Sequence, residues 1–261
     1  GAEDMSGGDT SEDGGDTVGG QTCLDVDDPY SSGSYVSPVG DYASGYSTDE
    51  VDVVYYNNFN HNTPGTYAVD EWRPDWNDPA WDNNITENHL AEVVEDGADR
   101  SLEITYPESM DPYGGVKWRT PLEDSYDELY LSYRIRFAPD WDGSADGGKI
   151  PGLCGGSCPS GGQCEGGPCI SPETGFSVRL MFSSGQEDSV KFYSYYNNKS
   201  EHFGPYCPPP YDDYNCRYGA SLAWDVDTTP GSWHTITMRL VMNTPGDADG
   251  LFEGFFDGEL V

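Results

Sequence analysis

The stretch ELYLSYRIRF, residues 128–137, alternates between two kinds of side chain over its whole length. The odd-numbered positions, from Leu129 to Phe137, are aliphatic or aromatic, whereas the even-numbered positions carry Glu, Tyr, Ser and Arg. A period of two is typical of an antiparallel strand that buries one face and exposes the other. This stretch therefore predicts a sheet with one face in a core.

Runs of similar character recur along the chain and give it the pattern of an all-β protein. They cover residues 51–59, 101–106, 115–119, 176–182, 189–196, 233–242 and 251–256. Helical periodicity is weak, and at most a short helical turn is expected within residues 75–90. Many strands at this spacing favour an antiparallel β-sandwich, and we expect one of jelly-roll type.

The last seven residues, FFDGELV, read as a β-hairpin. Asp257-Gly258 supplies the two positive-φ positions of a type I′ turn. The returning strand ends after three residues, which would leave the outgoing strand with an unpaired edge. We therefore expect that the domain is cut short here, or that its last strand comes from elsewhere.

A domain boundary is expected near residue 50. Residues 1–50 are mostly Gly, Asp, Ser, Thr and Tyr, and such a segment cannot bury enough apolar surface to order itself. Fifteen Asp and Glu precede the first basic residue, Arg73. The sequence thus predicts an acidic arm or linker over residues 1–50 and the β-domain over residues 51–261.

The formal net charge of −35, from 47 Asp and Glu against 12 Lys and Arg, excludes a nucleic-acid-binding protein, which needs a cationic surface. Dense acidity suits a halophilic or mineral-rich extracellular setting. Calcium binding is the weaker alternative, because Asp247, Asp249 and Gly250 form only a fragment of a calcium loop and fit a hairpin turn better. No metal site and no cofactor are predicted. No run of about 18 apolar residues occurs, so no membrane span is expected.

Seven cysteines indicate an oxidising compartment. They are Cys23, Cys154, Cys158, Cys164, Cys169, Cys207 and Cys216. The middle four lie in a stretch rich in Gly, Ser and Pro, which cannot hold its shape by packing. We expect disulfides rather than zinc, because the stretch has no CxxC spacing and no His. The pairing stays open, and Cys23 has no evident local partner.

Two further features fit a secreted or cell-surface protein. Asn84 in Asn-Ile-Thr and Asn198 in Asn-Lys-Ser are glycosylation acceptors by rule. The chain starts at Gly1 without a signal peptide, as a processed secreted protein would.

Three segments place polar and charged side chains on shared strand faces. The first, GGKIPGL at residues 147–153, contains one of only four lysines in the chain. In the second, FSVRLMF at residues 176–182, alternation places the Ser and the Arg on the face opposite the apolar residues. In the third, KFYSYY at residues 191–196, alternation places the Lys and two Tyr on one face. The candidates are Lys149, Ser177, Arg179, Lys191, Tyr193 and Tyr195, with His202 close after the last segment. In one concave sheet they would line one groove.

These residue types suit β-elimination from a uronic-acid polymer. Arg or Lys with a hydroxyl donor can neutralise the substrate carboxylate, which makes the neighbouring C5 proton removable. Tyrosine can remove that proton and protonate the departing O4 if nearby cations lower its pKa from about 10. A local cationic face would also attract an anionic polymer to an acidic protein.

In order and content these motifs resemble polysaccharide lyase family 14, the alginate and glucuronan lyase-like jelly rolls. The resemblance covers residues 51–261 and includes the segment from Trp233 through Asn243-Thr244-Pro245-Gly246 to Asp249-Gly250. It implies that Lys149 and Arg179 engage the uronate, that Tyr193 and Tyr195 act as base and acid, and that Ser177 occupies a catalytic position. It also implies an acidic polysaccharide as partner. From their positions on and just after the tyrosine strand, Lys191 and His202 are expected to bind the substrate. The cysteine-rich insertion would sit beside the groove.

A function from another class stays open. The chain could serve as a non-catalytic extracellular module that binds glycans or forms a surface filament or sheath. The acidic arm, Cys23 and the interrupted C-terminal hairpin motivate this hypothesis, because an arm or strand exchanged between subunits would build a homo-oligomer.

Overall fold

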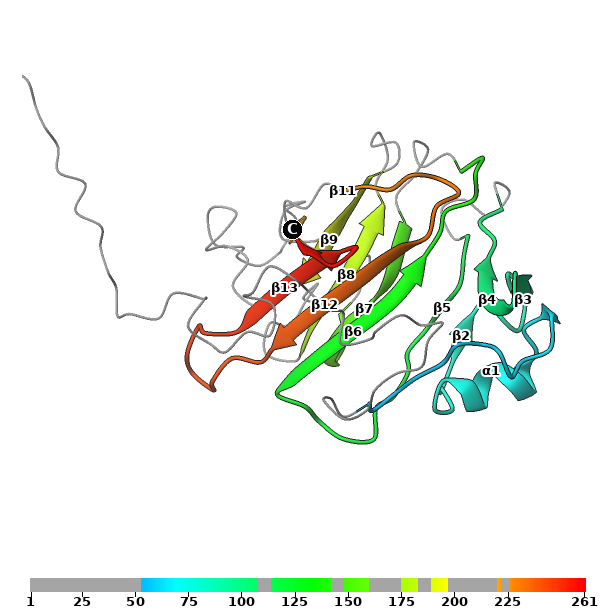
Figure 1. The fold of residues 1–261 in the computed structure, drawn as a ribbon. Coiled ribbons are helices and arrows are strands. Elements are labelled where there is room, and N and C mark those ends of the chain that lie inside the picture. The colour runs from blue at the N-terminus through cyan, green and yellow to red at the C-terminus, as the bar shows by residue number, and fades with distance from the viewer. Residues whose placement is uncertain are drawn as a thin grey trace, which may run out of the picture. The chain divides into compact units, whose positions relative to one another are not determined.

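The computed structural model describes residues 53–107, 114–141, 148–159, 175–182, 189–196, 220–221 and 226–261, all within the unit Ser37–Val261 (Figure 1). The predicted arm over residues 1–50 lies outside the described residues. The described part consists of antiparallel strands and one short helix, as predicted. None of its helices is long and apolar enough to cross a membrane.

Two sheets form the main body. Sheet I has the order β10-β9-β8-β7, and β11 also pairs with β9. Its strands are β7 (Gly148–Gly156), β8 (Gly175–Phe182), β9 (Ser189–Tyr195), β10 (Ala220–Ser221) and β11 (Val226–Asp227). Sheet II has the order β14-β13-β12-β6. Its strands are β6 (Glu128–Ile135), β12 (His234–Val241), β13 (Leu251–Phe256) and β14 (Glu259–Leu260).

Sheets I and II pack face to face and share one hydrophobic core (Figure 1). Sheet I contributes Val178, Leu180 and Phe182 from β8 and Val190 and Phe192 from β9, and sheet II contributes Ile236 and Met238 from β12. At Gly254 the sheets approach so closely that an added Cβ would lie 1.9 Å from the Phe192 ring. Because the core takes the even-numbered residues of β8, its odd-numbered residues project from the opposite face of sheet I.

A smaller hydrophobic cluster organises the N-terminal part of the domain. Around it lie sheet III, of order β1-β3-β4, the helix α1 and the two-stranded pair β2-β5. Their bounds are β1 (Gly65–Thr66), α1 (Val69–Asp75), β2 (Asp82–Asn83), β3 (Ala91–Asp96), β4 (Asp99–Ile104) and β5 (Lys117–Trp118). Val116 and Trp118 pack against this cluster, so alternation directs Lys117 and Arg119 away from it.

The predicted strands at 101–106, 115–119, 128–137, 176–182, 189–196, 233–242 and 251–256 are confirmed as β4, β5, β6, β8, β9, β12 and β13 with small shifts at their ends. The strand predicted at 51–59 is wrong: residues 53–59 are irregular, and the Tyr55 hydroxyl donates to the Asp75 carbonyl instead. The helix begins at Val69, ahead of the window in which a turn was expected.

The C-terminal hairpin is confirmed. Asp257 and Gly258 have φ values of 50° and 86°, and β14 pairs with β13 through Phe255 and Leu260. The fragment around Asp249 is a hairpin turn between β12 and β13, because its carboxylate accepts hydrogen bonds from the backbone nitrogen and the hydroxyl of Thr244, each 2.7 Å long.

Candidate active site

Four of the predicted residues meet on the face of sheet I that points away from the core. Ser177 of β8 lies opposite Tyr195 of β9, and Arg179 of β8 lies opposite Tyr193. These two cross-strand pairs are neighbours on one face, so their side chains form a compact block. The prediction that the two strands share one sheet is therefore confirmed.

The two tyrosines form a buried pair. Tyr195 is 1% exposed and Tyr193 is 8% exposed. The Tyr195 hydroxyl donates to the Tyr193 hydroxyl at 3.4 Å, and the two rings meet edge to face with centroids 5.3 Å apart. The two hydroxyl groups are therefore close enough to exchange a proton.

Lys149 joins the block from the neighbouring strand. Its Nζ lies 5.2 Å from the centroid of the Tyr193 ring. The pairing of β7 with β8 shifts register between Lys149 and Gly152. A Cβ on Gly152 would lie 2.5 Å from the Arg179 Cα, so only glycine allows this close approach. The glycine-rich motif thus belongs to a strand and brings its lysine beside the tyrosines.

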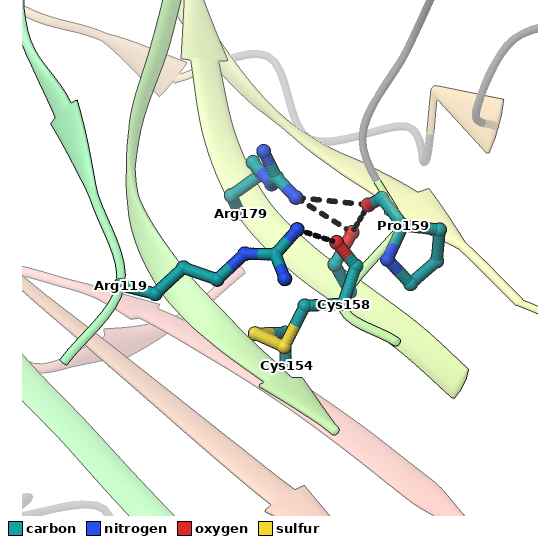
Figure 2. Close-up of a disulfide and its surroundings, with 6 residues drawn as sticks. Arg119, Cys154, Cys158, Pro159 and Arg179 are labelled. Carbon is teal, nitrogen blue, oxygen red and sulfur yellow. Dashed lines mark hydrogen bonds between the residues drawn. A yellow bond between two sulfur atoms is a disulfide. The ribbon is translucent and has the colours of Figure 1, made fainter. Parts of the chain in front are cut away.

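Arg179 is held by hydrogen bonds on the same face. Its Nη2 donates to the Ser177 Oγ at 2.9 Å and to the Pro159 carbonyl at 3.0 Å, and the Ser177 Oγ donates to that carbonyl at 2.6 Å (Figure 2). Burial is the main influence on the guanidinium and lowers the pKa of Arg179, which Tyr195 counteracts in part. Ser177 is fully buried, and its hydroxyl contacts both the Arg179 guanidinium and the Pro159 carbonyl.

Sequence reasoning missed two further cations, Lys117 and Arg119. Burial lowers the pKa of Lys117, and the charges of Arg179 and Arg119 lower it further. Burial, Arg179 and Lys117 in turn lower the pKa of Lys149, which stays solvent-accessible. We call Lys117, Arg119, Lys149 and Arg179 the cationic cluster. The sequence signal for them is the spacing of two scarce basic residues on one face of the strand predicted at residues 115–119.

A disulfide-closed turn lies against this cluster. Cys154 and Cys158 are bonded, and the turn between them places Gly156 and Cys158 at positive φ values of 60° and 48°. The Cys158 carbonyl accepts a hydrogen bond of 2.9 Å from the Arg119 Nη2. Figure 2 shows both guanidinium groups directed at the consecutive carbonyl oxygens of Cys158 and Pro159. The expected position of the insertion beside the site is confirmed for this part.

The remaining candidates differ in what the structure says of them. Lys191 of β9 pairs with Met181 of β8, which on its other side pairs with Lys149 of β7. Lys191 therefore lies two residues before Tyr193 on the same strand, next to the tyrosine pair. Asn84 is buried and its Nδ2 donates to the Gly115 carbonyl at 2.8 Å, an arrangement that disfavours a glycan there. The predictions for His202, Asn198, Cys23, Cys164, Cys169, Cys207 and Cys216 lie outside the described residues.

Comparison with known proteins supports the fold and identifies the family. A model of the family described as Polysaccharide lyase 14 matches residues 94–261. No curated protein matches the sequence.

Several solved structures share the fold. Alginate lyase Aly36B is 21% identical, with 79% of this chain and 76% of that chain covered and a TM-score of 0.58. A variant of it in complex with alginate tetrasaccharide is 19% identical, with the same coverage and a TM-score of 0.59. The marine PL-14 alginate lyase from Aplysia kurodai is 20% identical, with coverages of 76% and 75% and a TM-score of 0.55.

The predicted jelly-roll sandwich is therefore confirmed by the structure and by its likeness to these lyases. The family match spans most of the described domain, including every strand that carries the cationic cluster and the tyrosine pair. The chain belongs to polysaccharide lyase family 14 and is accordingly an enzyme of the class that cleaves polysaccharides by β-elimination.

Proposed function

We propose that the protein is a secreted lyase that cleaves a uronic-acid polysaccharide. The observation that supports this most directly is the position of the tyrosine pair beside Lys149 and Arg179, within a chain of net charge −35. A neutral polysaccharide would not need four clustered cations, whereas a polyuronate carries one carboxylate on each sugar. The solved neighbours are named as alginate lyases, which makes alginate the first polymer to test.

In the proposed reaction, Arg179 and Lys149 neutralise the carboxylate of the sugar that is cleaved. The Pro159 carbonyl oxygen, which accepts from both Arg179 and Ser177, marks where a carboxylate oxygen would find the same two donors. Charge-assisted hydrogen bonds to a carboxylate are stronger than those to a neutral carbonyl, so the substrate can displace this contact. Neutralisation stabilises the negative charge that develops when the C5 proton leaves.

The tyrosine pair supplies the proton transfers. One phenolate takes the C5 proton, the electron pair of that bond forms the C4=C5 double bond, and the C4–O4 bond breaks. The departing O4 receives a proton from the tyrosine pair, whose hydroxyls lie 3.4 Å apart. The Arg179 guanidinium favours the deprotonated form of a nearby phenol, and burial of both tyrosines keeps bulk water from the transfer.

The test is to incubate the full chain with alginate and, separately, with glucuronan, and to follow the ultraviolet absorbance of the unsaturated uronate product. We expect Tyr195→Phe to lower kcat about 100-fold or more, because it removes a group that transfers a proton. Tyr56→Phe is the matched control, since Tyr56 is 49% exposed and belongs to neither the tyrosine pair nor the cationic cluster. A folded wild-type chain that releases no unsaturated product from any polyuronate would refute the proposal.

Secretion is proposed on the basis of the Cys154–Cys158 disulfide, since such bonds persist mainly in oxidising compartments. Culture fractionation with an antibody against the domain tests it. That the reaction needs no cofactor, and that residues 1–50 form an arm, stay predictions.

A structural role, in which copies of this chain self-associate, is a second candidate that is compatible with catalysis. It is supported by exposed apolar side chains in the N-terminal part of the domain, where Val53 and Val54 are each 40% and Val69 is 47% exposed. Analytical ultracentrifugation of the wild type and of the Tyr193→Phe/Tyr195→Phe double variant tests this role: assembly of both supports it, and a monomer in both contradicts it.

A further inference from the structure

An exposed tryptophan adjoins the cationic cluster and has no role in the mechanism above. Trp81 is 39% exposed, directly before β2. The Lys117 Nζ and the Arg119 Cζ each lie 5.7 Å from the centroid of its ring. An exposed aromatic ring can stack on the apolar face of a sugar, and adjacent cations bind a carboxylate. The three side chains together therefore offer what one uronate residue requires.

Trp233 also has two cations over its ring, but the charges around it differ from those around Trp81. Arg134 and Arg136 lie 5.0 Å and 4.6 Å from the Trp233 ring centroid, but an acid is built into that group. Asp96 accepts from both Arg136, at 3.0 Å, and the Trp233 Nε1, at 2.9 Å. The charges that act most strongly on Lys117 are instead two other cations, Arg179 and Arg119. An incoming anion would relieve this repulsion.

The position of the group makes it continuous with the catalytic residues. Arg119 and Arg179 donate to the consecutive carbonyls of Cys158 and Pro159, so their guanidinium groups are neighbours (Figure 2). A polymer whose carboxylate lies on Arg179 would therefore bring an adjoining sugar within reach of Arg119. Trp118 packs into the N-terminal cluster and fixes the strand from which Lys117 projects.

We infer that Trp81, Lys117 and Arg119 form a second uronate-binding position next to the catalytic one, with Trp81 stacking on the sugar ring and the two cations holding its carboxylate. This inference rests on the proposed function only for the chemical class of the ligand. This second position orients the polymer on the enzyme, so that the polymer runs from the catalytic residues of sheet I toward the β2-β5 pair.

Binding is measured by affinity electrophoresis through gels that contain alginate or glucuronan, in the Tyr195→Phe background so that the polymer stays intact. We expect Trp81→Ala and Lys117→Gln each to weaken binding about tenfold. Trp81→Phe should retain most of the affinity, because it keeps an aromatic face. Arg134→Gln is the matched control: it removes one cation that also lies over a tryptophan, and it should leave binding unchanged.

The salt dependence separates the two contributions. Lys117→Gln should flatten the decline of affinity with salt, since one ionic contact is lost, whereas Trp81→Ala should lower affinity and leave the slope unchanged. Urea unfolding of each variant checks that the domain remains folded.

Unchanged binding by both folded variants would overturn this inference while leaving the proposed function intact. A wild-type chain that binds a polyuronate through these residues without cleaving it would refute the proposed function and support the second binding position. A wild-type chain that binds neither polymer would overturn both.

Discussion

In the proposed reaction Lys149 must carry its proton to neutralise the substrate carboxylate, and its surroundings make that proton easier to lose. Burial, followed by the charges of Arg179 and Lys117, lowers the pKa of Lys149 from its ordinary value of 10.5. The active form exists below the lowered pKa and disappears as the pH rises through it. We therefore expect kcat/KM to fall on the alkaline side at a pH below 10.5. Lys117→Gln should shift that fall to higher pH, because it removes one repelling charge.

The assignment of this alkaline fall has its own control. Lys149→Arg keeps a positive charge throughout the pH range, since arginine is effectively always protonated. If the fall belongs to Lys149, it disappears in the arginine variant from the pH profile of whatever activity remains. If the fall persists at the same pH, it belongs to the tyrosine pair.

At the scale of elements, we expect the disulfide-closed turn to compete with the substrate for Arg179 while it stabilises the domain. Replacing both cysteines, Cys154→Ser/Cys158→Ser, should lower the free energy of unfolding by about 2 kcal/mol, as expected for so short a closed loop. It should also lower KM, because a looser turn holds the Pro159 carbonyl less firmly on Arg179. Urea unfolding and initial rates measure the two effects. A double variant with unchanged KM would show that the carbonyl does not compete with the substrate.

The elements also show which features the sequence could predict. Alternation found β6, β8 and β9 and placed Ser177, Arg179, Tyr193 and Tyr195 correctly, because both the strand period and the choice of face are local. It missed β7, since a strand of sequence GKIPGLCGG has no alternating pattern and is specified by close backbone approach to β8.

Local patterns could not predict that β5 contributes Lys117 and Arg119 to the cationic cluster, for a different reason. Lys117 and Arg119 approach the tyrosine strands only through tertiary packing, which depends on Trp118 entering a cluster formed mostly by residues 59–104. The irregular segment at 53–59 shows the opposite error: its apolar residues suggested a strand, but packing and side-chain hydrogen bonds hold it without one.

At the scale of the whole molecule, the net charge of −35 predicts opposite responses of stability and activity to salt. Screening weakens the self-repulsion of the folded chain, so the free energy of unfolding should rise from low to molar salt. The same screening weakens attraction between the cationic cluster and a polyanion, so kcat/KM should fall. Parallel urea titrations and rate measurements test both trends, and activity that rises with stability would contradict the assigned role of the cluster.

The arrangement of the cationic cluster also bears on how products leave. If the proposed substrate is correct, we expect a long polyuronate to occupy Lys117, Arg119, Lys149 and Arg179 together, whereas a short product places fewer carboxylates on them. Each lost contact returns the fragment to a molecule whose 47 Asp and Glu repel it. We therefore expect cleavage to convert a tightly bound chain into weakly bound fragments, and short products to inhibit the enzyme little.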